Sequence, residues 1–292
     1  MRIDSHLHLW SPARGDYGWL TPDLPICREI TLDEARRTAT GIDAVILVQA
    51  APTEAETRFL LDIAAHAGGF VRAVVGWTDL AADDAPARIA ALAGEPRLAG
   101  LRPMLQDIAD PDWILRPEIE PALAAMERAG LVLDLLVRPA HLPRCVELAR
   151  RHPGLAMVLD HAAKPSIAQC GHAAWAEALH RLAADTAIAC KLSGLITEAA
   201  PGAGFDALAP YARTVFDAFG ADRILWGSDW PVLTLAASYD AWRGAAEALT
   251  GMMAPDAVDA VFGGNAARIY RARASSDQME SSDRIKMLDL SA

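Results

Sequence analysis

The chain has 292 residues, of which 52% are hydrophobic, and its formal net charge is −11. This length and hydrophobic content suffice for a large core, and they allow one or two domains. The negative charge argues against nucleic acids and anionic membrane surfaces as partners, because both require clustered positive charge. No apolar run approaches the ~20 residues of a membrane span. We therefore expect a protein that binds neither nucleic acid nor membrane.

The four cysteines are isolated in the sequence. None forms a Cys-x-x-Cys pair, and no spacing among them indicates a zinc ribbon. They are typical of reduced thiols in a cytosolic protein. The first predicted strand begins at residue 2, which leaves no room for a signal peptide. We predict a soluble protein of the cytoplasm, and the sequence does not indicate its oligomeric state.

Polar and apolar residues alternate near the start of the chain, which is the period of a strand. The alternation predicts that His6 and His8 point to one side, together with Asp4 and Trp10. Two imidazoles side by side on a strand can chelate a metal ion or form a hydrogen-bonding electrophilic pair. A half-exposed edge strand with two polar residues is the structural alternative.

Residues 11–30 form a Pro- and Gly-rich loop that holds Tyr17 and Trp19. The loop is long for a connection between a strand and a helix, so it either covers a site or is a surface excursion. Two capping boxes follow, at residues 31–34 and 53–56, and each predicts the start of a helix.

Strand and helix patterns then alternate along the chain. The predicted strands begin near residues 2, 44, 73, 99, 131, 156, 188 and 224. Eight such units predict an α/β fold with a parallel sheet closed into a single-domain (β/α)8 TIM barrel, which we place at residues 1–272. An open doubly wound sheet is the rival, but no glycine-rich phosphate turn follows the first strand. We expect residues 273–292 to form a polar, flexible tail.

Polar residues follow the predicted strands, where a barrel of this kind builds its active site. They are His6 and His8, Gln49, Trp77 and Asp79, Arg102 and Gln106, Arg138, His161 and Lys164, Lys191 and Ser193, and Ser228, Asp229 and Trp230. Each has a structural alternative: His161 as a core histidine, Asp229 as a helix cap, Lys191 and Arg102 as partners of carboxylates. Apolar strands need no histidine or aspartate for their cores, and a buried unpaired charge is costly. Three histidines and one aspartate at one barrel mouth therefore predict a functional site.

Several stretches at these strand ends resemble the amidohydrolase superfamily. They are Asp-Ser-His-x-His-x-Trp, Gly-Trp-x-Asp-Leu, Gly-Leu-Arg, Leu-Asp-His-x-x-Lys-Pro, Cys-Lys-Leu-Ser-Gly and Gly-Ser-Asp-Trp-Pro. The resemblance runs from about residue 2 to residue 271 and is greatest for the branch of sugar lactonases similar to L-fuconolactonase and L-rhamnonolactonase. The 2-pyrone-4,6-dicarboxylate lactonases are more distant relatives.

The chain departs from the binuclear members of that superfamily. Those carry a bridging lysine or glutamate on strand four and a histidine on strand five, where this sequence has Arg102 and Asp134. The resemblance therefore implies at most one divalent ion, with zinc favoured. Its ligands would be His6, His8, His161 and Asp229. It also leaves metal-free catalysis open.

The resemblance implies hydrolysis of a lactone ring in a sugar acid, with Asp229 as general base and then general acid. His6, His8 and His161 would polarise the lactone carbonyl, directly or through one metal ion. We expect substrate contacts from five further side chains: Trp77, Arg102, Gln106, Lys191 and Trp230.

Three alternatives remain at this point. Arg102 near Arg138 would suit a polyanionic substrate, as in a pyrone-dicarboxylate lactonase. Related barrels decarboxylate aromatic acids with a single zinc ion, and a binding or scaffold protein on the same barrel is the third alternative.

Overall fold

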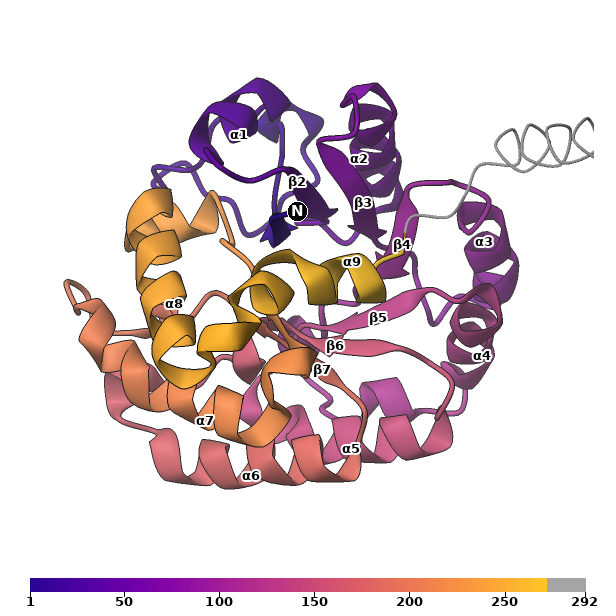
Figure 1. Cartoon of the computed structure of the whole chain (residues 1–292). Coiled ribbons are helices and arrows are strands. Elements are labelled where there is room, and N and C mark those ends of the chain that lie inside the picture. The colour runs from indigo at the N-terminus through magenta and orange to yellow at the C-terminus, as the bar shows by residue number, and fades with distance from the viewer. Residues whose placement is uncertain (272–292) are drawn as a thin grey trace, which may run out of the picture.

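The structure, a computed structural model, describes residues 1–271 (Figure 1). Eight parallel strands form one sheet in the order β1 to β8. Their bounds are Ile3–Leu7 (β1), Ala44–Val48 (β2), Val71–Gly76 (β3), Leu98–Leu101 (β4), Val132–Leu135 (β5), Met157–Leu159 (β6), Ala189–Leu192 (β7) and Ile224–Trp226 (β8). This order and direction confirm the predicted (β/α)8 barrel.

A helix follows each strand and packs on the outside of the sheet (Figure 1). The bounds are Leu32–Thr38 (α1), Glu54–His66 (α2), Ala85–Leu92 (α3), Glu120–Ala129 (α4), Leu142–Arg151 (α5), His172–Asp185 (α6), Ala209–Phe219 (α7) and Tyr239–Met253 (α8). A ninth helix, α9 (Asn265–Ile269), ends the described chain, so the tail predicted at 273–292 lies outside the described residues.

The barrel closes between its first and last strands. Leu7 forms a parallel bridge with Trp230, His8 N donates to Trp230 O at 2.8 Å, and Asp229 N donates to His6 O at 2.8 Å. These bonds fix the loop after β8 against the end of β1. The two segments that carry four of the predicted site residues, His6, His8, Asp229 and Trp230, are therefore neighbours.

Strands β6 and β8 are short. They begin near the predicted residues 156 and 224, and regular pairing ends at Leu159 and Trp226. Strand β4 likewise ends at Leu101, before Pro103, which lacks the N–H that a ladder requires. The polar residues after these strands lie in turns at the barrel mouth. In a turn, side chains do not alternate between two sides as they do in a strand.

Two apolar clusters form the core. The larger lies between the sheet and the surrounding helices. The smaller fills the lower interior of the barrel with small and branched residues from the strands, among them Ile3, Ile46, Val75 and Leu225. Helix α9 lies across this end of the barrel (Figure 1), and Tyr270, which follows it, adds a fully buried ring to the cluster. The lower end is therefore packed, and polar groups occupy the interior above it.

The two predicted capping boxes are only half formed. Thr31 and Thr53 accept bonds from the backbone N–H groups of Glu34 and Glu56, as expected. The carboxylate of Glu56 instead reaches past the helix to the loop after β2, where it accepts from Ala50 N at 2.9 Å and Ala51 N at 2.6 Å. These bonds tie α2 to a loop at the barrel mouth.

None of the helices in residues 1–271 combines the length and apolarity that crossing a membrane requires. The four cysteines are all free thiols.

Candidate active site

Strand β1 delivers His6 and His8 to the mouth, but its alternation is interrupted. The pairing of β1 with β2 shifts register between Asp4 and Leu7. The alternation predicted Asp4 on the same side of the strand as His6 and His8. Because of the register shift, Asp4 points to a different side. Its carboxylate accepts from Ser228 N at 2.9 Å and from the hydroxyl of Tyr239 in α8 at 3.0 Å. Asp4 therefore joins β1 to the β8 loop and to α8.

Steric constraints require glycine at positions 227 and 194, beside His6 and His161. A Cβ on Gly227 would lie 2.7 Å from the Cβ of His6. A Cβ on Gly194, whose φ is +63°, would lie 2.5 Å from His161 Nδ1. Because real side chains do not approach this closely, only glycine at both positions lets the imidazoles occupy these places.

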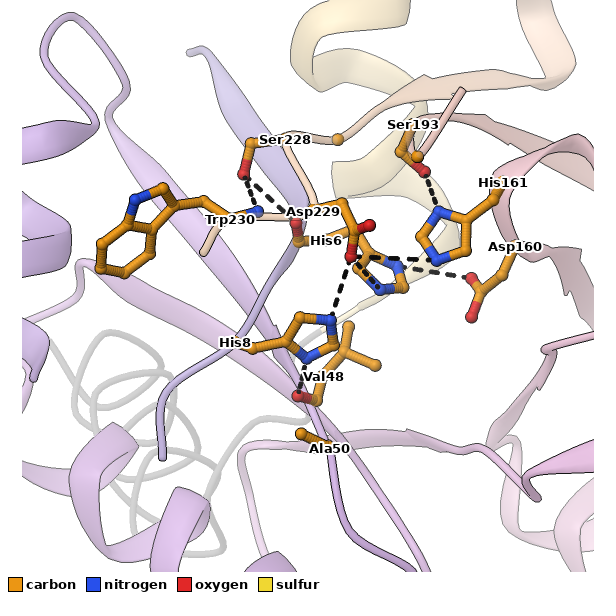
Figure 2. Close-up of polar contacts among 12 residues, drawn as sticks. His6, His8, Val48, Ala50, Asp160, His161, Ser193, Ser228, Asp229 and Trp230 are labelled. Atoms are coloured by element: carbon orange, nitrogen blue, oxygen red, sulfur yellow. Dashed lines mark hydrogen bonds and ion pairs between the residues drawn. The ribbon is translucent and has the colours of Figure 1, made fainter. Parts of the chain in front are cut away.

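Each imidazole is held through its Nδ1 atom. His8 Nδ1 lies 2.8 Å from the carbonyl oxygen of Val48, and His161 Nδ1 lies 2.9 Å from Ser193 Oγ (Figure 2). His6 Nδ1 faces Asp160 Oδ1 at 3.5 Å and Lys191 Nζ at 3.1 Å. These contacts orient the rings, so the three Nε2 atoms point toward one another.

Asp229 lies at the centre of the three rings (Figure 2). Its Oδ1 atom is 3.2 Å from His8 Nε2, 3.7 Å from His6 Nε2 and 3.9 Å from His161 Nε2. We call these four residues the histidine cluster. Asp229 itself has a φ of +60°, a left-handed conformation that is uncommon outside glycine and often found at functional sites.

The pKa shifts favour neutral rings at His6 and His161 and an ionised carboxyl group at Asp229. Burial lowers the pKa of His161 to about 4, with Asp229 opposing the shift, and burial together with Lys191 lowers the pKa of His6 well below its usual range. Burial alone would raise the pKa of Asp229, but the neighbouring histidines, His161 foremost, hold it well below its usual range. At neutral pH, Asp229 is therefore a carboxylate that faces the neutral rings of His6 and His161.

Residues of the cluster could hold one divalent ion. The Val48 carbonyl accepts from His8 Nδ1–H, so His8 Nε2, which faces Asp229 Oδ1 at 3.2 Å, would be the ring atom that binds the ion. Two ligand atoms on a tetrahedral zinc ion at ~2.1 Å lie ~3.4 Å apart, close to the spacings found here. Ligand atoms of His6, His161 and Asp229 also lie within 4.8 Å of one another.

A second group of buried charges lies beneath the histidine cluster. Lys191 Nζ lies 2.5 Å from Asp134 Oδ2 and 3.0 Å from Asp160 Oδ1, and Arg102 Nη1 lies 3.0 Å from Asp160 Oδ2. Tyr270 donates its hydroxyl to Asp134 Oδ1 at 2.7 Å. We call Arg102, Asp134, Asp160 and Lys191 the ionic layer. Its four side chains are almost wholly buried.

The position of Lys191 corrects its predicted role. It is fully buried, and its ammonium group is used by two carboxylates and by the ring of His6. Strand β7 ends one residue later, so Lys191 points into the barrel below the mouth rather than into a pocket. Lys191 contacts His6 from below and is not among the residues that line the pocket.

A pocket of about 210 Å³ opens above the histidine cluster. Its walls combine members of the histidine cluster with other polar side chains and with apolar side chains. The lining residues are His8, Trp19, Ala50, Arg102, Met104, Gln106, Asp107, Leu136, His161, Lys164, Asp229 and Val232. Of the five predicted substrate contacts, Arg102 and Gln106 lie in this wall.

Trp77 and Trp230 do not line the pocket. Trp230 is 3% exposed, packs in the outer core, and points away from the histidines (Figure 2). Trp77 follows β3, where its backbone N–H and carbonyl both bond the Thr57 hydroxyl of α2. Both predictions assumed that a residue at a strand end faces the mouth, but after β3 and β8 the chain turns these side chains elsewhere.

The two arginines of the polyanion alternative do not converge on the pocket. Arg102 lines it, but its guanidinium is engaged by Asp160, by the Gln49 carbonyl and by Gln49 Oε1 at 3.0 Å. Arg138 is exposed and lies outside the lining. The structure gives no support to a site built on this pair.

Sequence reasoning missed the role of Trp19 and gave Lys164 none. Trp19 comes from the long loop at 11–30, and its Nε1 donates to Ala50 O at 2.7 Å, which places its ring over the pocket. The length of the loop and its aromatic residues were the available signal. Lys164 enters the wall from the turn after β6.

Comparison with known proteins agrees with this architecture. The family model described as amidohydrolase matches residues 3–272. An L-fucono-1,5-lactonase of Burkholderia ambifaria is 47% identical over 285 residues, which cover 95% of this chain and 98% of that protein. An L-fucono-1,5-lactonase of Burkholderia multivorans is 37% identical over 286 residues, which cover 92% of this chain and 96% of that protein.

A solved amidohydrolase from Burkholderia multivorans, crystallised with bound zinc, superimposes with a TM-score of 0.87 at 36% identity. The match covers 93% of this chain and 99% of the other. With the match to the family model over nearly the whole barrel, these similarities show that the chain belongs to the amidohydrolase family.

Proposed function

We propose that this member of the amidohydrolase family hydrolyses the ring ester of a sugar lactone. The observation that carries the proposal is the ionised Asp229, held among three imidazoles at the floor of a pocket the size of one sugar ring. The two L-fucono-1,5-lactonases among its relatives support a 6-deoxy-aldono-1,5-lactone as the substrate.

The proton transfers follow from the position of Asp229. Its carboxylate takes a proton from a water molecule, whose oxygen bonds to the lactone carbonyl carbon. The bond from that carbon to the ring oxygen then breaks, and Asp229 returns the proton to the departing ring oxygen. The products are one hydroxyl group and one carboxylic acid, which ionises at neutral pH. The low pKa of Asp229 keeps it in the ionised form that the first step requires.

The histidines activate the carbonyl in this scheme. His6, His8 and His161 would hold a divalent ion together with Asp229, and such an ion supplies Lewis-acid polarisation of the carbonyl oxygen. The low pKa values of His6 and His161 favour the ligand role, because a metal ligand must be neutral. The bonds to Val48 and Ser193 keep the rings in place.

The pocket wall suits a sugar lactone. Trp19, Leu136 and Val232 offer apolar surface to ring carbons, and Gln106 and Asp107 offer hydrogen-bonding groups to hydroxyls. The volume of about 210 Å³ is below the ~300–1,000 Å³ of pockets for drug-sized ligands. We therefore infer a monosaccharide lactone rather than an oligosaccharide.

The test is a panel of aldono-1,5- and aldono-1,4-lactones, with acid release followed by a pH indicator. We expect turnover of L-fucono-1,5-lactone and weaker turnover of lactones that differ in ring stereochemistry. A matched assay would follow carbon dioxide release from 2-hydroxybenzoates. Release of carbon dioxide without lactone opening would overturn the proposal.

Metal content is measured on the same preparation. We expect about one equivalent of zinc per chain, removal of this zinc by a chelator, and loss of activity that returns when zinc is added. Full activity in a preparation free of metal would assign carbonyl activation to the histidines alone.

A further inference from the structure

The chain leaves strand β6 through a backbone conformation that the mechanism above does not use. His161, Ala162, Ala163 and Lys164 have φ values of +52°, +49°, +61° and +50°. Four consecutive residues are therefore left-handed, and none of them is glycine. This conformation is sterically unfavourable for an L-amino acid. Strain of this kind persists only where surrounding contacts impose it, and it is concentrated at functional sites.

The surrounding structure holds this turn firmly. Trp175 in α6 donates its Nε1–H to Ala162 O at 2.8 Å, and Lys164 N donates to His161 O at 2.8 Å. Ala162 and Ala163 are fully buried. The turn is thus a fixed element of the barrel mouth and not a flexible loop.

The turn brings its first and last residues to the same place. In a turn of about three residues, side chains at positions i and i+3 lie on the same face. His161 and Lys164 occupy these positions, and both line the pocket, whereas Ala162 and Ala163 pack into the core. The strained backbone therefore places a lysine beside the histidine cluster.

Lys164 differs from the other cation of the pocket wall. The guanidinium of Arg102 is committed to Asp160 and Gln49. Lys164 Nζ has its ion-pair contact with Glu198 Oε1 at 4.0 Å, the outer limit of such a contact, and its side chain is 21% exposed. Among the described pocket residues, Lys164 thus carries the positive charge that is least compensated by protein groups.

We propose that Lys164 binds the negative charge that ring opening creates. This inference rests on the proposed function. The lactone is neutral, but its carbonyl oxygen gains negative charge in the transition state, and the product is a carboxylate. A cation in the wall therefore stabilises the transition state and the product more than the substrate. The strained turn is the structural means by which the chain places this cation.

The experiment compares Lys164→Met, Lys164→Arg and Arg138→Met, with L-fucono-1,5-lactone as substrate and sodium L-fuconate as product. Lys164→Met should lower kcat by about tenfold or more and weaken L-fuconate binding by about tenfold or more, with KM changed by less than about threefold. Lys164→Arg keeps the charge, so its L-fuconate affinity should stay within about fivefold of the wild type. Arg138→Met removes an exposed cation near the mouth and should change neither quantity. Calorimetry measures product binding independently of turnover.

Equal L-fuconate affinity in Lys164→Met and wild type would overturn the inference, even with lactone hydrolysis intact. A parallel loss of kcat and product binding in Lys164→Arg, with a lowered melting temperature in both variants, would also overturn it, because this pattern indicates a role in folding. Wild-type protein that opens no lactone and binds no aldonate would contradict the proposed function and this inference together. The lactone assay alone separates that case from the first two.

Discussion

The histidine cluster and the ionic layer are neighbours in the same barrel, and both consist of buried ionisable side chains. In the ionic layer each charge meets an opposite charge within 3.0 Å. In the histidine cluster one carboxylate faces three imidazoles, and its oxygen atom borders an open pocket. The difference shows that burial of charge does not by itself mark a site. A functional site is marked instead by ligand atoms that converge on one point without pairing with opposite charges.

The substitution Asp229→Asn tests the histidine cluster. The amide keeps the shape of the side chain but cannot take a proton from water, so kcat should fall by about 10³-fold or more. The backbone bond from Asp229 N to His6 O is unchanged, and the melting temperature should therefore stay within a few degrees of wild type. Steady-state kinetics and thermal unfolding measure the two effects. Asp79→Asn, at an exposed position outside the pocket, is the matched control, and a wild-type rate in Asp229→Asn would refute the role of Asp229.

The substitution Lys191→Met tests the ionic layer and should mainly lower the free energy of unfolding. Removal of the ammonium group leaves Asp134 and Asp160 in the barrel interior with less compensation, and breaking a buried pair typically costs about 3–5 kcal/mol. Unfolding in urea measures this loss. Lys164→Met is the control at the mouth and should cost less than about 1 kcal/mol, because its one ion pair is long and partly exposed. Equal losses in the two variants would contradict the distinction between the two regions.

Glu56 sharpens the comparison as a buried carboxyl group whose hydrogen-bond partners are backbone N–H groups. Burial raises its pKa to about 7, and the bonds from Ala51 and Ala50 oppose the shift. The folded protein therefore binds the proton more tightly than the unfolded chain. The stability from this group is complete below about pH 4.5 and is lost as the pH rises through 7.

The measurement compares wild type with Glu56→Gln at about pH 5 and pH 8. The free energy of unfolding of wild type should fall by about 2 kcal/mol relative to the variant between these two values. A constant difference would show that Glu56 does not titrate in this interval.

Much of the architecture is predictable from local pattern. Apolar runs of strand length alternate with helical periods, and eight repeats of this pair leave few alternatives to a barrel. The rule that barrel mouths collect the polar strand ends then brought His6, His8, His161 and Asp229 together, although they are distant in sequence.

The remaining site residues depend on local backbone direction, which the pattern does not encode. Lys191 points into the barrel one level below the mouth, and Trp230 points outward because the chain turns after β8. Trp19 reaches the pocket from the long loop at 11–30, where its ring donates a hydrogen bond to Ala50 O. The left-handed turn at residues 161–164 contains no glycine, so no residue type signals it in advance.

The closure of β1 against the β8 loop has a consequence for synthesis of the protein. His8 and Asp229 are separated by 221 positions, yet they lie on adjoining segments. At a translation rate of about 5–20 residues per second, roughly 10–45 s elapse between the emergence of these two residues from the ribosome. During that interval the nascent chain exposes the edge of β1, and His6 and His8 lack their carboxylate partner Asp229. Activity therefore appears late in synthesis, and the first strand depends on its β2 partner, or on a chaperone, until the last strand arrives.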